Sequence, residues 1–153
     1  MFEDTQIPEG MSPEVLEHLM FPKNYGKLEE PTCAGIAMDE KTNEYVIFYL
    51  KLNDDNIQDV KFATNGCQDT VVIGSMFSDM IIENNIAYAQ VAIQKMHEKL
   101  VNMSEQQKVC AEIVFSSFVA AMLNKENREA GKDEEVHILK MKESCDLEGK
   151  KDE

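Results

Sequence analysis

The chain has 153 residues, and with 15 lysines and arginines against 29 aspartates and glutamates its formal net charge at pH 7 is −14. This length suffices for one domain with a hydrophobic core but not for two, and an apolar content of 43% sets the chain apart from acidic disordered polypeptides. The negative charge argues against binding to nucleic acid or to an anionic membrane surface, because both require basic residues, and it leaves basic proteins and cations as partners.

The N-terminal region predicts no targeting segment and one short helix. It carries neither a basic stretch nor an apolar core, so we expect no signal peptide, and no apolar run of 18 residues exists that would span a membrane. The helix starts with Ser12 as its cap and Pro13 in the first helical position, and it ends before Pro22.

The next segment predicts a small antiparallel sheet. Residues 45–52 are rich in β-branched and aromatic side chains, and residues 57–64 alternate apolar with polar ones. The turn cluster 53–56 joins these two strands into a hairpin. A third strand, roughly 35–39, precedes them, and the short connections imply antiparallel order.

After residue 67 the hydrophobic period changes to that of helices. Residues 71–83, 86–101 and 105–125 each show apolar side chains at helical spacing, and the last stretch is the longest. The order of elements predicts an α+β fold, in which the helices pack on one face of a three-stranded antiparallel sheet.

Charged residues dominate the C-terminal part of the chain. We therefore divide the sequence into an α+β domain over residues 1–125 and a charged extension over residues 126–153. Within the extension, the apolar side chains of residues 136–141 predict a short helix or strand, and residues 148–153 predict a solvated tail.

Four cysteines, Cys33, Cys67, Cys110 and Cys145, set the expected compartment. They form no C-x-x-C pair, and the chain is neither small nor rich in cysteine. Free thiols in a reducing cytosol explain them better than two disulfides, so we expect a cytoplasmic protein.

Two segments are similar to signatures of a known family. Residues 15–28 read VLEHLMFPKNYGKL, and residues 57–67 read IQDVKFATNGC. Both match, without gaps and in the expected order, the U-type iron–sulfur cluster assembly scaffold family, also called IscU/NifU-like. The resemblance covers about residues 13–125 and implies the IscU/NifU N-terminal fold.

The resemblance also implies a cluster site. The family binds a nascent [2Fe–2S] cluster on three cysteines and one further ligand, and Cys67 and Cys110 stand at the second and third cysteine positions. Thr42 stands at the first, so this chain is a divergent member that lacks that cysteine. Glu44 replaces an aspartate that is a ligand in zinc-binding members. The implied metal ligands are therefore Cys67, Cys110 and Glu44.

Each candidate ligand also has a purely structural explanation. Both thiols lie near predicted helix N-termini, where the helix dipole favours a thiolate, but Cys110 also suits a core-facing helix position and Glu44 an exposed turn. Cys33 precedes Thr42 by nine residues, and the predicted strand at 35–39 between them would place it well away from the turn, which favours a structural thiol. Cys145 is interpreted as an exposed spare thiol, although its tail would allow it to reach the site in the same chain or in a dimer partner.

We expect an iron–sulfur cluster assembly scaffold or carrier that holds a labile cluster or a metal with an incomplete ligand set. Two alternatives stay open: a degenerate interaction protein with the scaffold fold, and a zinc-binding sulfur-transfer partner of a cysteine desulfurase. Expected partners are a cysteine desulfurase or other iron–sulfur assembly proteins, and a homo-oligomer is compatible with the sequence. No acid/base pair, Ser–His arrangement or phosphate-binding loop suggests an enzyme.

Overall fold

The computed structural model describes residues 13–99 and 104–141. Its elements in chain order are α1 (Pro13–Met20), β1 (Cys33–Asp39), β2 (Tyr45–Asn53), β3 (Asn56–Thr64), α2 (Gln68–Ile81), α3 (Tyr88–Lys99), α4 (Glu105–Glu129) and β4 (His137–Met141). The expected α+β class is confirmed, and every predicted helix and strand has a counterpart. The end of the predicted 86–101 helix and the predicted tail at 148–153 lie outside the described residues.

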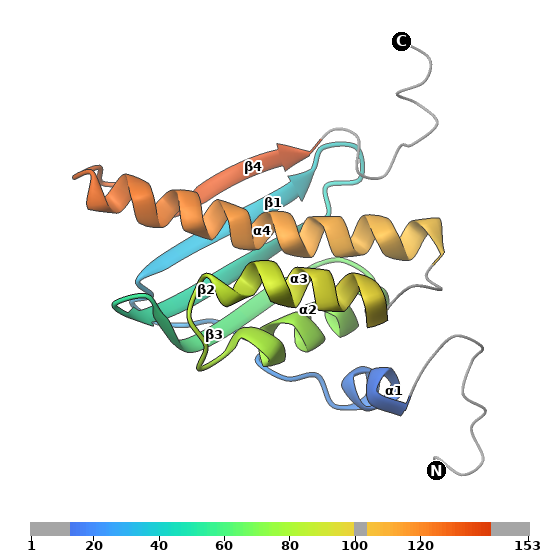
Figure 1. Ribbon diagram of the computed structural model, residues 1–153. Helices are drawn as coiled ribbons and strands as arrows, with labels where there is room; N and C mark the ends of the chain where they lie inside the picture. The colour runs from blue at the N-terminus through green and yellow to red at the C-terminus, as the bar shows by residue number, and fades with distance from the viewer. Residues whose placement is uncertain (1–12, 100–103, 142–153) are drawn as a thin grey trace.

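The sheet has four strands in the order β3-β2-β1-β4, as Figure 1 shows. β1 pairs with β2 and β2 pairs with β3 in antiparallel fashion, as predicted. The expectation of only three strands is wrong, because β4 pairs in parallel with the outer edge of β1. A charged segment with few apolar residues gives a weak strand signal, and here the backbone of β1 supplies the partner.

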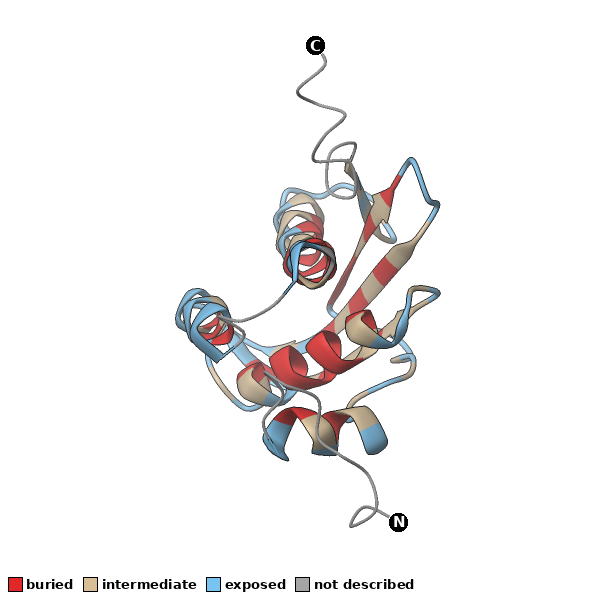
Figure 2. Cartoon of the chain, turned by 90° about the vertical axis from the view of Figure 1, so that its right-hand side faces the viewer, coloured by how far each residue is buried: buried red, intermediate tan, exposed pale blue. Residues whose placement is uncertain are grey.

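The helices cover one face of the sheet, as predicted. α4 lies along β1 and also contacts β2 and β4, while α2 packs against β3 and α4. Figure 2 shows the buried residues gathered between the helices and the sheet. α1 and α3 each pack against α2, so they form an outer part of the helical layer.

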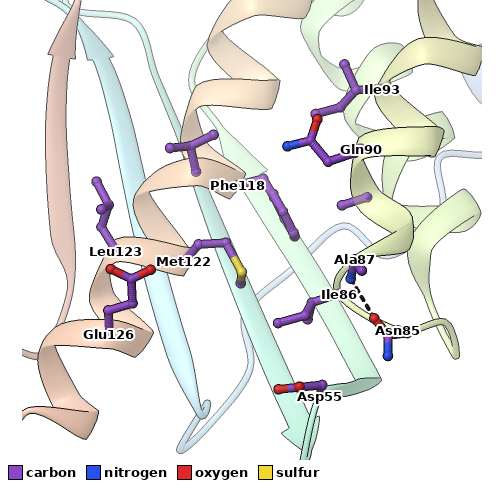
Figure 3. A pocket seen from close by; sticks show the side chains of 12 residues that line it. Asp55, Asn85, Ile86, Ala87, Gln90, Ile93, Phe118, Met122, Leu123 and Glu126 are labelled. Atoms are coloured by element: carbon purple, nitrogen blue, oxygen red, sulfur yellow. Dashed lines mark hydrogen bonds between the residues drawn. The ribbon is translucent and has the colours of Figure 1, made fainter.

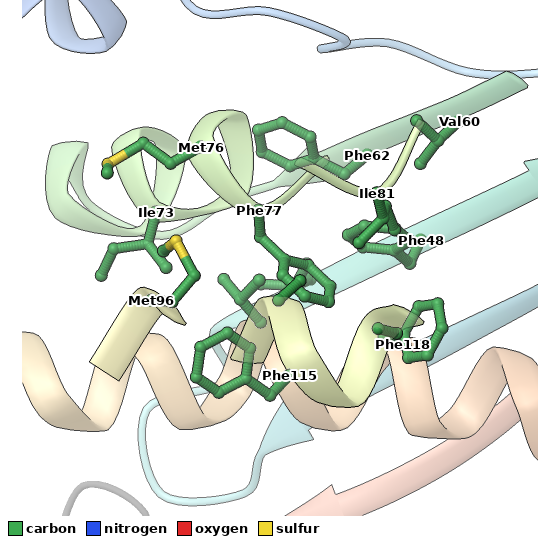
Figure 4. Packing of buried hydrophobic residues seen from close by; sticks show 14 of the residues in the cluster. Phe48, Val60, Phe62, Ile73, Met76, Phe77, Ile81, Met96, Phe115 and Phe118 are labelled. Carbon is green, nitrogen blue, oxygen red and sulfur yellow. The ribbon is translucent and has the colours of Figure 1, made fainter. Parts of the chain in front are cut away.

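The core is built around phenylalanine rings. Phe77 of α2 lies 5.7 Å from Phe48 of β2 and 5.6 Å from Phe118 of α4, measured between ring centroids (Figure 4). Phe48 and Phe118 meet edge to face at 6.0 Å. Such contacts add to the free energy of burial, so one aromatic cluster joins the two main helices to the sheet.

Gly35 allows α4 to approach the sheet closely. A Cβ atom at this position would lie 2.1 Å from the backbone nitrogen of Ala121 and 2.4 Å from the backbone carbon of Ala120. Both of these atoms belong to the helix backbone and cannot rotate away. The spacing between β1 and α4 therefore depends on this glycine.

The segment 15–28 lies across α2 and β3 and is hydrogen-bonded to both. Nδ1 of His18 lies 2.6 Å from the hydroxyl oxygen of Ser75, which also accepts a hydrogen bond from the backbone nitrogen of Lys23 at 2.7 Å. The side chain of Asn24 donates to Ser78. The backbone of Gly26, which has a positive φ of 148°, donates to Phe62 at 2.8 Å. The polar residues of this signature thus have a structural role.

Residues 126–141 include the end of α4 and the strand β4, which contacts β1 and α4. The expected boundary between residues 125 and 126 falls inside α4, which runs to Glu129. In the last turn of α4, the guanidinium group of Arg128 donates to four carbonyl oxygens, those of Pro31, Thr32, Glu134 and Glu135. These bonds fold the chain back so that β4 reaches the edge of β1.

Candidate functional site

Two helix N-termini bring two thiols together. Cys67 is the N-cap residue of α2 and follows the last strand of the hairpin by three residues. Cys110 lies in the second turn of α4. The two sulfur atoms are 3.8 Å apart although the residues are 43 positions apart in the chain. The structure therefore joins the two residues that the sequence predicts as cluster ligands.

The two thiols have different environments. Cys67 is exposed, whereas Cys110 is 1% exposed. The pKa of the Cys110 thiol is raised to about 11, mainly by burial; a hydrogen bond with Thr70 acts in the opposite direction, and the neighbouring Cys67 adds to the increase. The helix N-terminus was expected to favour a thiolate, but at Cys110 burial has the larger effect. Without a cation, this thiol stays protonated at neutral pH.

A side-chain bridge fixes the two helices beside the thiols. Gln107 donates a hydrogen bond to the carboxylate of Asp69 in the first turn of α2, at 3.3 Å. The same side chain forms a capping box with Ser104 at the start of α4, because its oxygen accepts from the backbone nitrogen of Ser104. The segments that carry Cys67 and Cys110 are thus held in a fixed relation.

The turn between β1 and β2 lies next to this site. The side chain of Asn65, two residues before Cys67, accepts a hydrogen bond from the backbone nitrogen of Tyr45 and donates one to the carbonyl of Asn43. Thr42 is exposed, and its hydroxyl accepts a hydrogen bond from the backbone of Glu44. The turn that carries the position expected for the first cysteine is therefore tied to the segment that leads into Cys67.

Glu44 is partly buried in this turn. Among residues 13–99 and 104–141, no group of three or more His, Cys, Asp or Glu side chains is placed to hold a metal ion. The structure thus brings Cys67 and Cys110 together, and the role of Glu44 as a third ligand stays a prediction.

The other two cysteines differ from this pair. Cys33 is fully buried at the start of β1, and burial raises its pKa to about 12. The β1–β2 turn follows the other end of the strand, so the six steps from Cys33 to Asp39 separate them by about 20 Å. This placement agrees with a structural thiol. Cys145 lies outside the described residues.

A separate pocket lies between α3, α4 and the β2–β3 turn, at the opposite end of the sheet (Figure 3). Its volume is about 540 Å³, and Phe118, Met122, Ile86 and Ile93 line its apolar wall. Asp55 and Glu126 lie among its polar lining residues. Sequence analysis missed it because its apolar residues show only ordinary helical spacing.

Two polar contacts of the site were also missed. The bridge from Gln107 to Asp69 and the contact from Asn65 to Asn43 each join segments far apart in the chain. No local sequence motif predicts these two contacts. Within the described residues, no helix is long and apolar enough to cross a membrane.

Comparison with known sequences gives consistent similarities. A family model described as NifU-like N terminal domain matches residues 11–131. The iron–sulfur cluster assembly scaffold protein IscU of Aquifex aeolicus is 29% identical over 103 residues, which cover 65% of this chain and 66% of that protein, just under two thirds of its length. IscU 1 of Archaeoglobus fulgidus is 25% identical over 114 residues, covering 74% of each chain.

Solved structures share the fold at low sequence identity. The N-terminal domain of a NifU-like protein from Brucella abortus superposes with a TM-score of 0.63 at 14% identity, covering 76% of this chain and 94% of that one. A candidate SUF-system scaffold protein from Fervidobacterium islandicum AW-1 gives a TM-score of 0.60 at 17% identity, covering 74% and 96%. These likenesses support the architecture described above.

Proposed function

Because the chain belongs to the NifU-like N-terminal domain family, we propose that it is an iron–sulfur cluster assembly scaffold with Cys67 and Cys110 as cluster-binding thiols. The observation that supports this most is the 3.8 Å distance between the two sulfurs. The relatives from Aquifex aeolicus and Archaeoglobus fulgidus are named as scaffold proteins of this kind. We propose a [2Fe–2S] cluster as the cargo, with zinc as a possible alternative occupant.

The donor set suits soft metal centres. Thiolate is the usual ligand of iron–sulfur clusters and also of zinc. The exposed Cys67 is accessible to an incoming cluster or metal, and the buried Cys110 lies directly behind it. A bound cation favours loss of the thiol proton, which offsets the raised pKa of Cys110. Glu44 is proposed as a further, oxygen ligand from the adjacent turn.

We propose partners of the iron–sulfur assembly machinery, with a cysteine desulfurase as the sulfur donor. A formal charge of −14 suits partners with a basic docking surface, because complementary charges raise the association rate. This electrostatic contribution weakens with salt.

One observation favours a second candidate function. Thr42 stands where the family has its first cysteine, and a threonine hydroxyl does not ionise near neutral pH. A chain that lost its cluster would still offer the fold and surface to assembly partners, and a chain that binds only zinc would serve in sulfur transfer. Both alternatives predict that no stable cluster forms.

Anaerobic reconstitution with iron and sulfide separates these functions. The full chain is treated alongside the variants Cys67→Ala and Cys110→Ala, and the visible absorption spectrum and the bound iron, sulfide and zinc are measured. Cys33→Ala is the matched control, because it removes a buried cysteine at the other end of β1. Circular dichroism in the far ultraviolet confirms that each variant is folded.

We expect cluster absorption bands in the wild type and in Cys33→Ala, and loss of these bands in the other two variants. Equal bands after Cys67→Ala would overturn the site assignment. Zinc without iron in the wild type would support the sulfur-transfer alternative, and the absence of both metals would support the interaction protein.

A further inference from the structure

The pocket between α3 and α4 is a groove between two helices that both pack against α2. Side chains of α4 line it on one side, and side chains of α3 and of the segment just before α3 line it on the other (Figure 3). Its one end is marked by the ring contact of His97 with Phe115, at 5.4 Å between centroids, because these two residues join the helices without lining the pocket. The β2–β3 turn, which carries Asp55, borders the other end.

The apolar lining of this groove is partly open to water. Val119 is 45% exposed, and Ile93, Met122 and Leu123 are half-buried. Apolar side chains gathered around an open groove are typical of a protein interaction site, whereas a small-molecule pocket encloses most of its ligand. The groove therefore suits a row of apolar side chains from a partner protein.

The length of the groove fits two turns of a helix. Its lining on α4 runs from Phe118 to Glu126, eight residues or about 12 Å of helix. On a docked helix, apolar side chains at positions i, i+3 or i+4, and i+7 share one face and span about 11 Å. A row of three such side chains therefore has the length of the groove.

The end of the groove at the β2–β3 turn is acidic. Asp55 and Glu126 line it, and Glu129 is three residues beyond Glu126 on the same helix. The ammonium group of Lys125 lies 3.9 Å from Asp55 and 2.8 Å from Glu129. Three carboxylates and one ammonium group leave two negative charges among these four side chains. A basic side chain of a partner would meet complementary charge here, and the net charge of −14 adds a long-range attraction.

From this shape, apolar lining and charge we propose that the groove binds an amphipathic helix of a partner protein, with its apolar row on Phe118 and Met122 and a basic side chain beside Asp55. The groove is separate from the thiol pair, because Met122 follows Cys110 by 12 residues of α4, about 18 Å along the helix axis. A partner helix can therefore stay bound while the thiols are loaded or emptied. The proposal goes beyond the scaffold function and does not depend on a bound cluster.

Fluorescence anisotropy with a model peptide and the full chain tests this binding. The probe is a fluorescein-labelled peptide of about 15 residues, a length at which isolated helices begin to be stable, with leucines along one helix face and lysines elsewhere. A second peptide has the same leucines and carries glutamates in place of the lysines. We expect the lysine peptide to bind at least about tenfold more tightly than the glutamate peptide.

Val119→Asp separates docking in the groove from general attraction to an acidic chain. The variant is more negative than the wild type, so an association driven by net charge alone would become tighter. Docking needs apolar contact here, and a carboxylate would have to lose water, so we expect the lysine peptide to bind at least about tenfold more weakly. Because the side chain is exposed, we expect the variant to fold, and circular dichroism in the far ultraviolet verifies it.

Glu126→Gln tests the charge at the end of the groove, and Glu112→Gln is its matched control. Both side chains are exposed on α4 and both substitutions remove one negative charge, but Glu112 does not line the groove. We expect Glu126→Gln to weaken binding of the lysine peptide about two- to fivefold, the contribution of one surface ion pair, and Glu112→Gln to leave it unchanged. Equal effects of the two variants would overturn the placement of the basic side chain.

Three other outcomes would overturn the proposal. These are a wild type that does not bind the lysine peptide, a Val119→Asp variant that binds it as tightly as the wild type does, and full displacement of the peptide by decyltrimethylammonium, which would make the groove a site for small amphipathic cations. Self-association of the wild type that Val119→Asp abolishes in analytical ultracentrifugation would identify a second copy as the occupant instead. Cys67→Ala is expected to bind the peptide as the wild type does, so failure of the scaffold function leaves this test intact.

Discussion

The two thiols of the candidate site differ in their access to water. Cys67 is exposed at the start of α2, and Cys110 is buried behind it with its pKa raised to about 11. An incoming electrophile or metal therefore meets Cys67 first. This asymmetry suggests an order of events in which Cys67 captures the cargo and Cys110 completes its binding.

Alkylation of the reduced protein checks the asymmetry. At pH 8, a thiol with a pKa of about 11 is ionised in on the order of one molecule in a thousand, and burial also blocks the reagent. We expect iodoacetamide to modify Cys67 at least about tenfold faster than Cys110 or Cys33. Peptide mass spectrometry over time measures the rates, and equal rates at Cys67 and Cys110 would contradict the structure.

His18 makes the attachment of segment 15–28 to α2 sensitive to acid. Burial lowers its pKa below the ordinary value of 6.5, and a neutral Nδ1 can accept the Ser75 hydroxyl proton, whereas a protonated one cannot. The unfolded chain therefore binds the proton more readily than the folded one. The stability that His18 contributes is complete above pH 6.5 and is lost as the pH falls towards the folded pKa.

We expect the free energy of unfolding of the wild type to approach that of His18→Gln as the pH is lowered from 7.5 to 5. Urea denaturation at each pH measures both values. His97→Gln, at an exposed histidine of α3, gives the part of the pH dependence that comes from elsewhere. A gap between wild type and His18→Gln that widened in acid would contradict the assignment.

Gly35 sets the distance between a strand and a helix. Gly35→Ala would place a methyl group inside van der Waals contact with the backbone of α4, and we expect it to lower the free energy of unfolding by about 3 kcal/mol, as overpacking of a fixed contact does. Gln94→Ala, on the exposed side of α3, should change it by less than about 0.5 kcal/mol. A neutral effect of Gly35→Ala would mean that α4 packs less closely than described.

A single arginine contributes to the attachment of β4, beside its pairing with β1. Arg128 donates to carbonyl oxygens on both sides of the sheet edge, near Pro31 and near Glu134. Hydrogen bonds from the side chains of Asn127 and Asn124, together with one from His137, lower the pKa of the Glu134 carboxylate to about 2, so it stays charged throughout the physiological range.

Replacing Arg128 by alanine is expected to release β4 and to cost about 2 kcal/mol, because four carbonyl oxygens, two of them in partly buried hydrogen bonds, lose a charged donor. Hydrogen exchange of the amides in His137–Met141 should accelerate more than exchange in β2. Arg128→Lys should restore little of the protection, since an ammonium group cannot serve the same fork of acceptors. Unchanged exchange in β4 would show that strand pairing alone holds it.

Local patterns predict some elements better than others. The hairpin of β2 and β3 was predictable from alternation around a turn cluster, and α4 from its apolar spacing. The sequence of β4 is compatible with a helix as well as a strand. Its extended conformation depends on pairing with β1 and on the hydrogen bonds of Arg128. The same long-range bonds explain why the boundary at residue 125 does not coincide with an element end.

The candidate site was predictable only in part. Cys67 and Cys110 follow from resemblance to a family, but nothing in the sequence gives the 3.8 Å between their sulfurs. The bridge from Gln107 to Asp69 and the contact from Asn65 to the β1–β2 turn arise from tertiary packing. These contacts decide which side chains surround the thiols, and no local motif contains that information.

The two ends of the described sheet carry different features. One end carries the thiol pair and the β1–β2 turn, and the other carries the apolar pocket between α3 and α4. A strongly acidic chain joins them. The thiol pair and the pocket therefore lie on separate parts of the described structure, and a change at one end need not alter the other.

The function proposed for this chain is to hold an iron–sulfur cluster on Cys67 and Cys110 and to pass it on. Visible circular dichroism of the reconstituted full chain mixed with an apo [2Fe–2S] ferredoxin tests it most directly. We predict that the signal of the donor decays as the signal of holo-ferredoxin rises, and that Cys67→Ala prevents both changes. A cluster that stays on this chain, or a chain that takes up none under the same conditions, would contradict the claim.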